Sequence, residues 1–498
     1  MSKVLKTNQQ FSWLGGVDEK GVIVEPGHEL YGQSIAGKEL HFPGASGSTV
    51  GSDVIINLAR KGYAPEKIFM EEKDVKKDNI TTWGCIFGNI PLVVKNKTSK
   101  PIDRSQIEKL GIDEEILDSI LKASDYLEFK DFIQVTSPVQ IAGVSYKTIK
   151  DAGLEVREDF SRKFKVKTQA VLNPAGMDLK DWRKQKIPED FAEKQVRIIR
   201  NYEKMGVEPT CTCIPYYTGT IGIPFSEGYW SESSAVSFAN SALGIRTNRE
   251  SALSSLLWAL AGYAPKYGLH LDENRNPQIE IDVDANLEST TDFGTLGNVI
   301  GKIVKDKIPY IRGIKPSNNL LDKLKSIGAA AAASGSVALY HMENITPETR
   351  AKTISLDKFE EHIKLDEKDL LETKEKLNSG NPEEIDLVAF GCPHASHREV
   401  KEVAELLSGK KVKEGIDLMV YTSRATKAWC DRMGYTSEIR RAGGSVCCDT
   451  CMVVEPIEAI GYKTTATNSG KAAHYLPTFC KQKVVFDDTK KIIEMITK

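Results

Sequence analysis

Four short apolar segments near the carboxyl end of the chain constrain its fold most strongly. They read DLVAFGCP, GIDLMVYTS, GSVCCDTCMVV and KTTATNS, and each continues into a loop of small residues. Charged stretches with helical spacing separate them. Strands that alternate with helices form parallel sheets, because a parallel neighbour is reached only through a crossover connection. We therefore expect an α/β region whose loops gather at the carboxyl ends of its strands, where such folds bind ligands.

The amino-terminal part of the chain has a different pattern. GVIVEPGHELYGQSIAGKELHFPG mixes short apolar runs with Gly and Pro, which predicts strands and turns. A helix followed by a strand is predicted over 52–70, and GCIFGNIPLVV resembles a further buried strand. The polar segment Lys95 to Ser105 contains a proline and predicts a linker. We expect a small β-rich domain over 1–98 and a large α/β region over 99–498.

Composition excludes several classes of protein. The chain has 498 residues, 40% of them hydrophobic, and a formal net charge of -2, so no basic surface predicts binding to nucleic acid. It contains no apolar run of about 18 residues and no signal-peptide core at its start, so we expect no membrane span. Nine cysteines, an odd number, argue against a disulfide framework and predict reduced thiols in the cytoplasm.

Three cysteines lie where predicted strands end. They are Cys213 in TCIPYY, Cys392 in FGCPHASHRE and Cys451 in DTCMVV. Three thiolates can hold an iron–sulfur cluster and leave one iron open to a substrate. An open iron is a Lewis acid that can bind a leaving hydroxyl group.

Spacing alone leaves other interpretations of these cysteines open. Cys211 and Cys213 could form a zinc site with Cys448 and Cys451, because Cys-x-x-Cys is a common zinc spacing. Cys392 could instead be a nucleophile, since His394 follows it closely. Each thiol could also be an ordinary buried side chain.

A glycine-rich loop, PGASGSTVGSD (Pro43 to Asp53), lies between a predicted strand and a predicted helix. Its glycines allow backbone N–H groups to converge on an anion, and the helix adds its positive end. A serine held there could act as a base. A turn with serine caps is the alternative. The small-residue stretch Ala329 to Ser336 predicts either a close helix contact or a loop against a ligand.

Several polar segments favour a small, oxygen-rich substrate. Trp230 to Glu250 is rich in hydroxyl, amide and guanidinium groups, and its arginines could bind a carboxylate or phosphate. The segments YGLH, TSRA and ATNSGKAAHY add further histidine, arginine and lysine side chains. An ion-paired helix end or a structural histidine is the alternative at each position.

These motifs together resemble the aconitase X family. LGGVDEKGVIVEPGHELYGQSIAGKELHFPGASGSTVGSDVI is similar to the small swivel domain of that family. Seven further segments are similar to its large catalytic part: TCIPYY, WSESSAVSFANSALGIRTNRE, YGLH, FGCPHASHRE, TSRATKAWCDRMGY, DTCMVVEP and TNSGKAAHYLP. The resemblance covers nearly the whole chain, and it implies an iron-dependent hydro-lyase with an aconitase-like architecture.

The resemblance also implies residue roles. Cys213, Cys392 and Cys451 match the family's iron–sulfur ligands, with a 4Fe-4S cluster expected and a 2Fe-2S cluster or a single iron as alternatives. Ser48 matches the catalytic base of the swivel domain. The residues expected to bind the substrate are Gly47, Thr49, Ser52, Asn173, Arg246, Asn248, Arg249, His270, Arg424 and Lys471.

Three features depart from the family pattern. The small domain is fused in front of the large one, so a separate small subunit is not needed. Ser46 stands where relatives often have a basic residue, and Gln140 stands where they often have histidine.

The substrate is expected to be a small anionic 3-hydroxy acid. Mevalonate 5-phosphate, dehydrated in an archaeal isoprenoid route, is favoured over cis-3-hydroxy-L-proline. A zinc or thiol enzyme, an RNA-binding iron sensor and an inactive scaffold are the alternatives from other classes.

Overall fold

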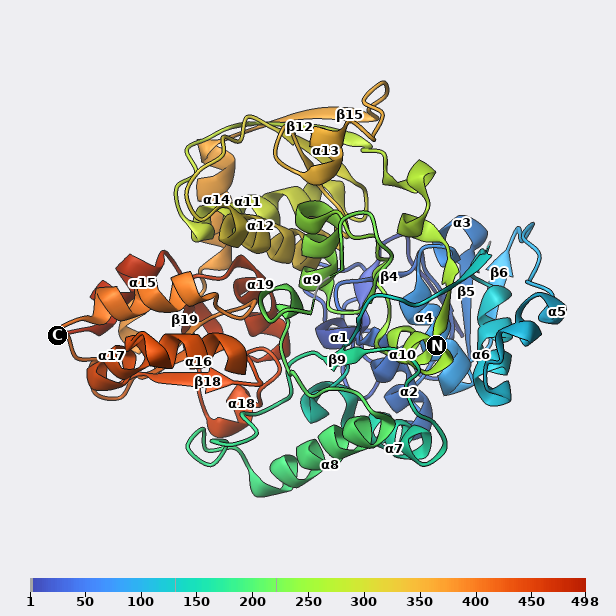
Figure 1. Cartoon of the computed structure of the whole chain (residues 1–498), viewed down its shortest axis with the longest axis horizontal. Helices are drawn as coiled ribbons and strands as arrows, with labels where there is room; N and C mark the ends of the chain where they lie inside the picture. Colours follow the sequence, from blue (N-terminus) through green and yellow to red (C-terminus); the bar gives the residue numbers. More distant parts are fainter. Residues whose placement is uncertain (1–2, 130, 221) are drawn as a thin grey trace.

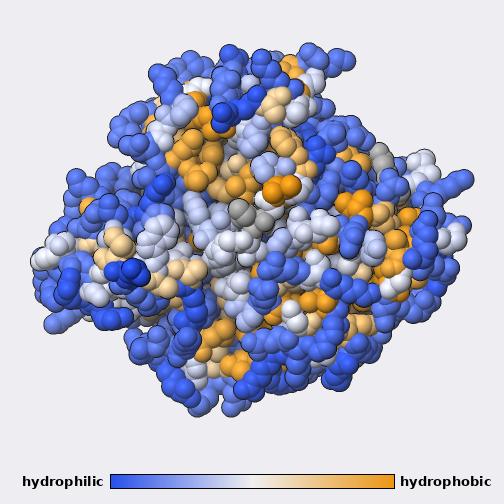
Figure 2. Space-filling model, in the orientation of Figure 1, coloured by the Kyte–Doolittle hydropathy of each residue, from blue (hydrophilic) through white to orange (hydrophobic). Residues whose placement is uncertain are grey.

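The computed structural model describes residues 3–129, 131–220 and 222–498. The molecule has four lobes arranged around a centre, as Figure 1 shows. The amino-terminal lobe and the lobe after it lie together on one side, the residues between about 277 and 375 form the upper lobe, and the carboxyl-terminal lobe lies opposite the amino-terminal one (Figure 1). The surface in Figure 2 is mostly hydrophilic, and no helix in the described ranges is both long and apolar enough to cross a membrane.

The first lobe is built on a parallel sheet with the order β1-β3-β5-β6. Its strands are β1 (Val4–Lys6), β3 (Glu39–His41), β5 (Lys67–Glu71) and β6 (Leu92–Lys95). Two helices, α2 (Gly51–Lys61) and α4 (Asn79–Gly88), pack together, and α2 presents apolar residues on its buried face.

Two details of this lobe differ from the sequence prediction. Much of the segment over 21–38 forms turns rather than strands, because its glycines adopt left-handed backbone angles. The first half of GCIFGNIPLVV completes α4, and only its second half is a strand, β6. A short apolar run does not distinguish a buried helix from a buried strand, which explains the error.

The second lobe contains a three-stranded parallel sheet in the order β10-β8-β9. The strands are β8 (Val139–Ile141), β9 (Ala170–Leu172) and β10 (Tyr229–Trp230). The helices around them are α6 (Glu114–Ser124), α7 (Tyr146–Lys163), α8 (Glu189–Met205), α9 (Ser233–Phe238) and α10 (Ala252–Ala261). An antiparallel pair joins β7 (Asp131–Gln134) to β11 (Tyr263–Lys266).

The upper lobe contains a parallel sheet in the order β14-β13-β12-β15. The strands are β12 (Ile279–Asp284), β13 (Pro309–Arg312), β14 (His341–Met342) and β15 (Glu361–Asp366). Its long helices are α11 (Thr290–Val304), α12 (Leu320–Gly335) and α14 (Glu367–Leu377). The alanine stretch lies in α12, where a Cβ on Gly335 would stand 1.9 Å from the carbonyl oxygen of Gly301 in α11. The predicted close helix contact is therefore confirmed.

The carboxyl-terminal lobe confirms the parallel sheet that the repeated strand pattern predicts. Its order is β18-β17-β16-β19-β20, and every neighbouring pair is parallel. The strands are β16 (Leu387–Phe390), β17 (Asp417–Thr422), β18 (Ser445–Cys448), β19 (Thr464–Thr467) and β20 (Lys483–Phe486). The main helices are α15 (His397–Leu407), α16 (Arg424–Arg432), α17 (Tyr435–Ala442), α19 (Gly470–Phe479) and α20 (Thr489–Ile496).

Candidate active site

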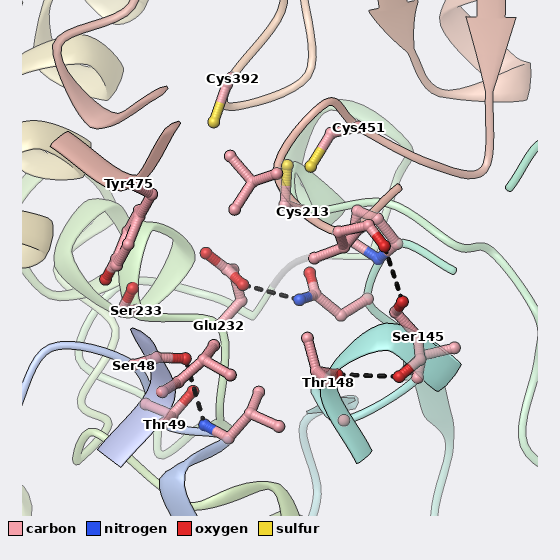
Figure 3. A pocket seen from close by; sticks show the side chains of 18 of the residues that line it. Ser48, Thr49, Ser145, Thr148, Cys213, Glu232, Ser233, Cys392, Cys451 and Tyr475 are labelled. Atoms are coloured by element: carbon pink, nitrogen blue, oxygen red, sulfur yellow. Dashed lines mark hydrogen bonds between the residues drawn. The ribbon is translucent and has the colours of Figure 1, made fainter. Parts of the chain in front are cut away.

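One cavity lies where the first, second and carboxyl-terminal lobes meet. The loops that follow β8, β9, β16 and β18 all reach it, as does the amino end of α2. In Figure 3 three sulfur atoms gather at one end of the cavity, and two hydroxyl side chains lie at the opposite end. The lining residues are Leu14, Ser48, Thr49, Val50, Gly143, Val144, Ser145, Thr148, Asn173, Pro174, Cys213, Glu232, Ser233, Cys392, Cys451, Val453, Val454, Lys471 and Tyr475.

The three sulfurs belong to Cys213, Cys392 and Cys451, which are buried free thiols. The neighbouring thiol of Cys392 lowers the pKa of Cys451 to about 7, helped by backbone N–H groups and by Lys471. The backbone N–H of His394 donates to Cys213 Sγ at 3.2 Å. The fold thus places three sulfurs from distant parts of the sequence against one cavity and supports them with N–H donors.

The side chain of His394 joins two of these cysteine loops. Its Nε2 donates to the Thr450 carbonyl oxygen at 2.8 Å, so Nδ1 accepts from the Thr212 hydroxyl at 3.0 Å. Burial lowers the pKa of His394 to about 4, which keeps the ring neutral. Both ring nitrogens are occupied by these partners, so the geometry does not favour Cys392 as a nucleophile activated by His394.

Gln140 supports the loop that contains Cys213. It is fully buried in β8, and its Nε2 donates to the Thr212 carbonyl oxygen at 3.2 Å. This contact lies one residue before Cys213. Gln140 departs from the family pattern, but its side chain supports the cavity wall and does not line the cavity.

The zinc interpretation does not fit the arrangement of the thiols. Cys211 and Cys448 are buried outside the cavity lining, whereas Cys213 and Cys451 face it. Among the residues that the structure describes, no three His, Cys, Asp or Glu side chains are placed to hold one metal ion directly.

A buried ion pair forms the central wall of the cavity. Lys471 Nζ contacts Glu232 Oε1, and Asn173 Nδ2 donates to Glu232 Oε2 at 2.6 Å. Burial opposes the charges on this pair, but each partner offsets that effect: the pKa of Lys471 is raised and that of Glu232 is lowered. The Oδ1 atom of Asn173 is buried without a hydrogen-bond partner. An unpaired buried acceptor that lines a cavity is suited to a ligand hydroxyl group.

The serine turn of the first lobe closes the opposite end. Ser48 and Thr49 precede α2, and Val50 N–H donates to Ser48 Oγ at 3.4 Å. The Thr49 hydroxyl is bonded to the Ser231 carbonyl oxygen in the second lobe. The positive end of α2 therefore lies beside the Ser48 hydroxyl, where it favours negative charge. Tyr475 completes this wall, and burial raises the pKa of its phenol to about 12.

Three further predicted residues lie in or beside this turn without lining the cavity. Gly47 has a φ of 72°, its N–H donates to Ser336 Oγ at 2.8 Å, and its carbonyl oxygen accepts from Arg249 at 2.8 Å. Arg249 and Ser336 thus bind the turn from two other lobes. Ser52 is fully buried in the first turn of α2.

The remaining four predicted binding residues lie away from the cavity lining. Arg246 pairs with Asp272, and His270 pairs with Glu227. Asn248 bonds the backbone of Tyr267 and Leu269. Arg424 pairs with Asp178 and Asp449. Each of these side chains therefore has structural partners in this arrangement.

Sequence reasoning did not identify several cavity residues. Glu232 lies in the polar segment Trp230 to Glu250, from which the sequence predicts only Arg246, Asn248 and Arg249 as binding residues. Gly143, Val144 and Ser145 follow β8 directly, and Pro174 follows β9. The rule that strand ends carry the site would have selected these loops, because each is a short turn after a buried parallel strand.

Comparison with known families identifies all four lobes. The aconitase X swivel domain matches residues 1–117, and the first, second and third domains of aconitase X match 107–273, 277–375 and 385–498.

Relatives of two kinds match the chain. The phosphomevalonate dehydratase large subunit of Methanocaldococcus jannaschii is 52% identical, and the match covers 72% of this chain and 89% of that protein. A phosphomevalonate dehydratase small subunit of Methanothrix thermoacetophila is 50% identical over 90 residues, which are 18% of this chain and 63% of that protein. The cis-3-hydroxy-L-proline dehydratase of Pseudomonas aeruginosa is 29% identical, covering 95% of this chain and 90% of that protein.

A solved structure agrees with this assignment. Holo aconitase X of Thermococcus kodakaraensis is 41% identical and superimposes with a TM-score of 0.72, covering 80% of this chain and 100% of that chain. Two of these relatives are named as a large and a small subunit, whereas the swivel domain here precedes the other aconitase X domains on one chain. The chain belongs to the aconitase X family.

Proposed function

We propose that this protein is an iron–sulfur dehydratase that removes water from mevalonate 5-phosphate to give trans-anhydromevalonate 5-phosphate. The observation that carries the proposal is the shared cavity: a hydroxyl from the swivel domain faces three thiols from the catalytic domains. Such a site can act on both carbons of a 3-hydroxy acid at once.

The donor set fits an iron–sulfur cluster. Cys213, Cys392 and Cys451 would hold it, because thiolates are the usual ligands of such clusters. Each cysteine of a cluster can bind a different iron, so the three sulfurs need not converge on one ion. When bound, the cluster supplies a Lewis acid for the leaving hydroxyl group.

The protein's own residues carry the proton transfer and the orientation. Ser48 takes the proton from the carbon beside the substrate carboxylate, and the positive end of α2 favours the charge that develops on its oxygen. Lys471 binds an anionic end of the substrate, and the free Oδ1 of Asn173 accepts from a substrate hydroxyl. The hydroxyl leaves from the neighbouring carbon, so one proton and one hydroxide depart together as water. Walls from three lobes limit the access of bulk water to this step.

The relatives support the phosphorylated substrate over hydroxyproline. The phosphomevalonate dehydratase large subunit is 52% identical to this chain, whereas the cis-3-hydroxy-L-proline dehydratase is 29% identical. The dehydration of cis-3-hydroxy-L-proline remains the second candidate, because that relative matches the chain over 95% of its length, swivel domain included.

The proposal is tested on anaerobically purified protein. Iron and sulfide are measured first, and dehydration of both candidate substrates is then followed. We expect bound iron with sulfide and faster turnover of mevalonate 5-phosphate. Ser48→Ala should retain iron but lose turnover by a factor of about 10²–10⁴, the usual contribution of a general base. Ser46→Ala, two residues earlier, is the matched control. Unchanged turnover in Ser48→Ala, or zinc in place of iron, would refute the proposal.

A further inference from the structure

The upper lobe contains a topological switch point of its own. In the sheet β14-β13-β12-β15, the chain passes from β12 to β13 and β14 on one side and then returns to place β15 on the other side of β12. In open parallel sheets, ligands bind at the carboxyl ends of the strands beside such a point. This location belongs to a lobe that contributes no lining residue to the cavity described above.

A second cavity lies at this switch point. Its volume is about 520 Å³, which falls within the range of small-molecule sites. The loops after β12 and β13 form its walls, and the first residue of α14 completes them. The lining residues are Val283, Asp284, Ala285, Asn286, Leu287, Phe293, Gly313, Ile314, Lys315, Pro316, Ser317 and Glu367.

A buried cation without a counter-ion stands against this cavity. Lys323 in α12 is only 6% exposed, yet no carboxylate of the described residues lies within ion-pair distance of its ammonium group. Its Nζ donates to Ser317 Oγ at 2.8 Å and lies 5.4 Å from the ring centre of Phe293, and both of those side chains line the cavity. Buried charges in proteins are normally paired, so this ammonium group is suited to an anionic ligand.

Two further features of the same wall attract an anion. Lys315 is an exposed lining residue to which the described part of the chain offers no ion-pair partner. The helix that follows this loop, α12, begins just beyond the lining residues, at Leu320, and it has no side-chain cap at its amino end, whereas capping boxes are present at the amino ends of α11 and α14. Free N–H groups at a helix start carry partial positive charge.

The acidic groups nearby already have partners. Asp284 pairs with Lys364 at 2.9 Å, and Glu367 accepts from the Asn286 backbone at 3.3 Å. Asp322 lies beside Lys323 in sequence, but its carboxylate accepts from the Tyr217 hydroxyl. None of these carboxylates lies within ion-pair distance of Lys315 or Lys323, although Glu367 keeps its own negative charge because its partner is a neutral N–H group.

We propose that this cavity binds a small phosphorylated organic molecule. The phosphoryl group lies at the Lys315 to Lys323 end, and the organic part packs on the apolar floor that Val283, Phe293 and Ile314 form. Asn286 and the carboxylates of Asp284 and Glu367, which also line the cavity, accept from hydroxyl groups of the ligand. This site is independent of the dehydration reaction proposed above.

The test measures binding of glycerol 3-phosphate to the full-length protein by calorimetry in phosphate-free buffer. Glycerol is the control for the phosphoryl group. Lys315→Gln and Lys323→Met each remove one charge, and Lys358→Gln removes an exposed charge elsewhere in the lobe. We expect each of the first two variants to weaken binding about tenfold, the usual effect of losing one charged hydrogen bond, and Lys358→Gln to bind like the wild type.

Hydrogen exchange locates the site and separates it from the catalytic cavity. Glycerol 3-phosphate should protect peptides covering 283–293 and 313–323, and it should still do so in Lys471→Met. If Lys323→Met does not fold, the surface variant Lys315→Gln and the exchange data on the wild type still decide whether this cavity binds glycerol 3-phosphate. Absence of binding, or binding that Lys471→Met abolishes and Lys315→Gln leaves unchanged, would overturn the proposal.

Discussion

Glu232 shows how one side chain can organise a cavity. Its two carboxylate oxygens bind Lys471 on one side and Asn173 on the other, and its side chain is 12% exposed. Because both partners face the cavity, the carboxylate fixes their separation and direction. We regard Glu232 as a positioning residue, since the groups expected to contact the substrate are the ones it holds.

Glu232→Gln tests that role. The amide keeps the shape of the side chain but leaves Lys471 without its counter-ion, so the ammonium should shift. A displacement of about 1 Å in a positioning group can cost about 10²-fold in rate. We expect kcat/KM for mevalonate 5-phosphate to fall by about that factor, with KM affected as well as kcat, and iron content to be retained.

Two comparisons separate positioning from general destabilisation. Glu232→Asp retains the charge and should recover part of the activity. Glu227→Gln removes a carboxylate that pairs with His270 outside the cavity lining and should leave KM unchanged. Equal kinetics in Glu232→Gln and the wild type would show that the ion pair is only structural.

The sequence predicts which residues belong to the site where their chemistry is distinctive. The three cysteines stand out because thiols at strand ends are few, and all three line one cavity. Arginine and histidine are less distinctive: Arg246 and His270 are engaged in ion pairs outside the cavity. A charged side chain near a site and one that pairs structurally look the same in a sequence, because only the packed neighbours tell them apart.

At the scale of single elements, the turn before α2 determines where the serine hydroxyl points. Gly47 has a left-handed backbone, and a Cβ there would stand 2.7 Å from Ser12 Oγ. Both its N–H and its carbonyl oxygen bond groups of other lobes, Ser336 and Arg249. The turn is therefore fixed by its own backbone and by two neighbouring elements.

Gly47→Ala should disturb this turn. The left-handed backbone costs an L-residue about 1–2 kcal/mol, and the new methyl group must also displace Ser12. We expect lower thermal stability and a loss of dehydration activity of about 10²-fold, because Ser48 moves. Gly32→Ala is the matched control: its φ is 78°, but nothing lies within 4 Å of a Cβ there.

Stability and activity distinguish the two glycine variants. Gly32→Ala should share the backbone cost and keep full activity. If Gly47→Ala were as active as Gly32→Ala, the turn would not control the position of the serine.

On the scale of the whole molecule, the swivel domain is held against the catalytic domains by a buried ion pair. Asp53 of α2 and Arg157 of α7 form a bidentate contact, and both side chains are 0% exposed. Asn57 of the same helix donates to the Ile149 carbonyl oxygen at 2.6 Å. The interface is therefore buried and specific, and it holds in place the domain that contributes Ser48 to the cavity lining.

Asp53→Asn should separate the domains. Removing one partner leaves the Arg157 charge buried, which typically costs about 3–5 kcal/mol. We expect a large fall in the free energy of unfolding, measured by denaturant titration, together with loss of activity. Arg60→Ala breaks an exposed pair with Glu155 between the same two helices and should cost only about 0–1 kcal/mol. Similar costs for the two variants would contradict the proposed importance of the buried pair.

The sequence by itself determined the alternation of strands and helices, the thiols at strand ends and the glycine-rich serine turn. These features are local, since they depend on the spacing of apolar residues and on backbone freedom along a few neighbours. Only the tertiary structure decided that one cavity is lined by Cys213, Cys392, Cys451 and Ser48. It also decided that Glu232 binds two other lining side chains, Lys471 and Asn173. Packing between lobes brings those groups together across hundreds of residues, and no local pattern records which partners a buried charge will meet.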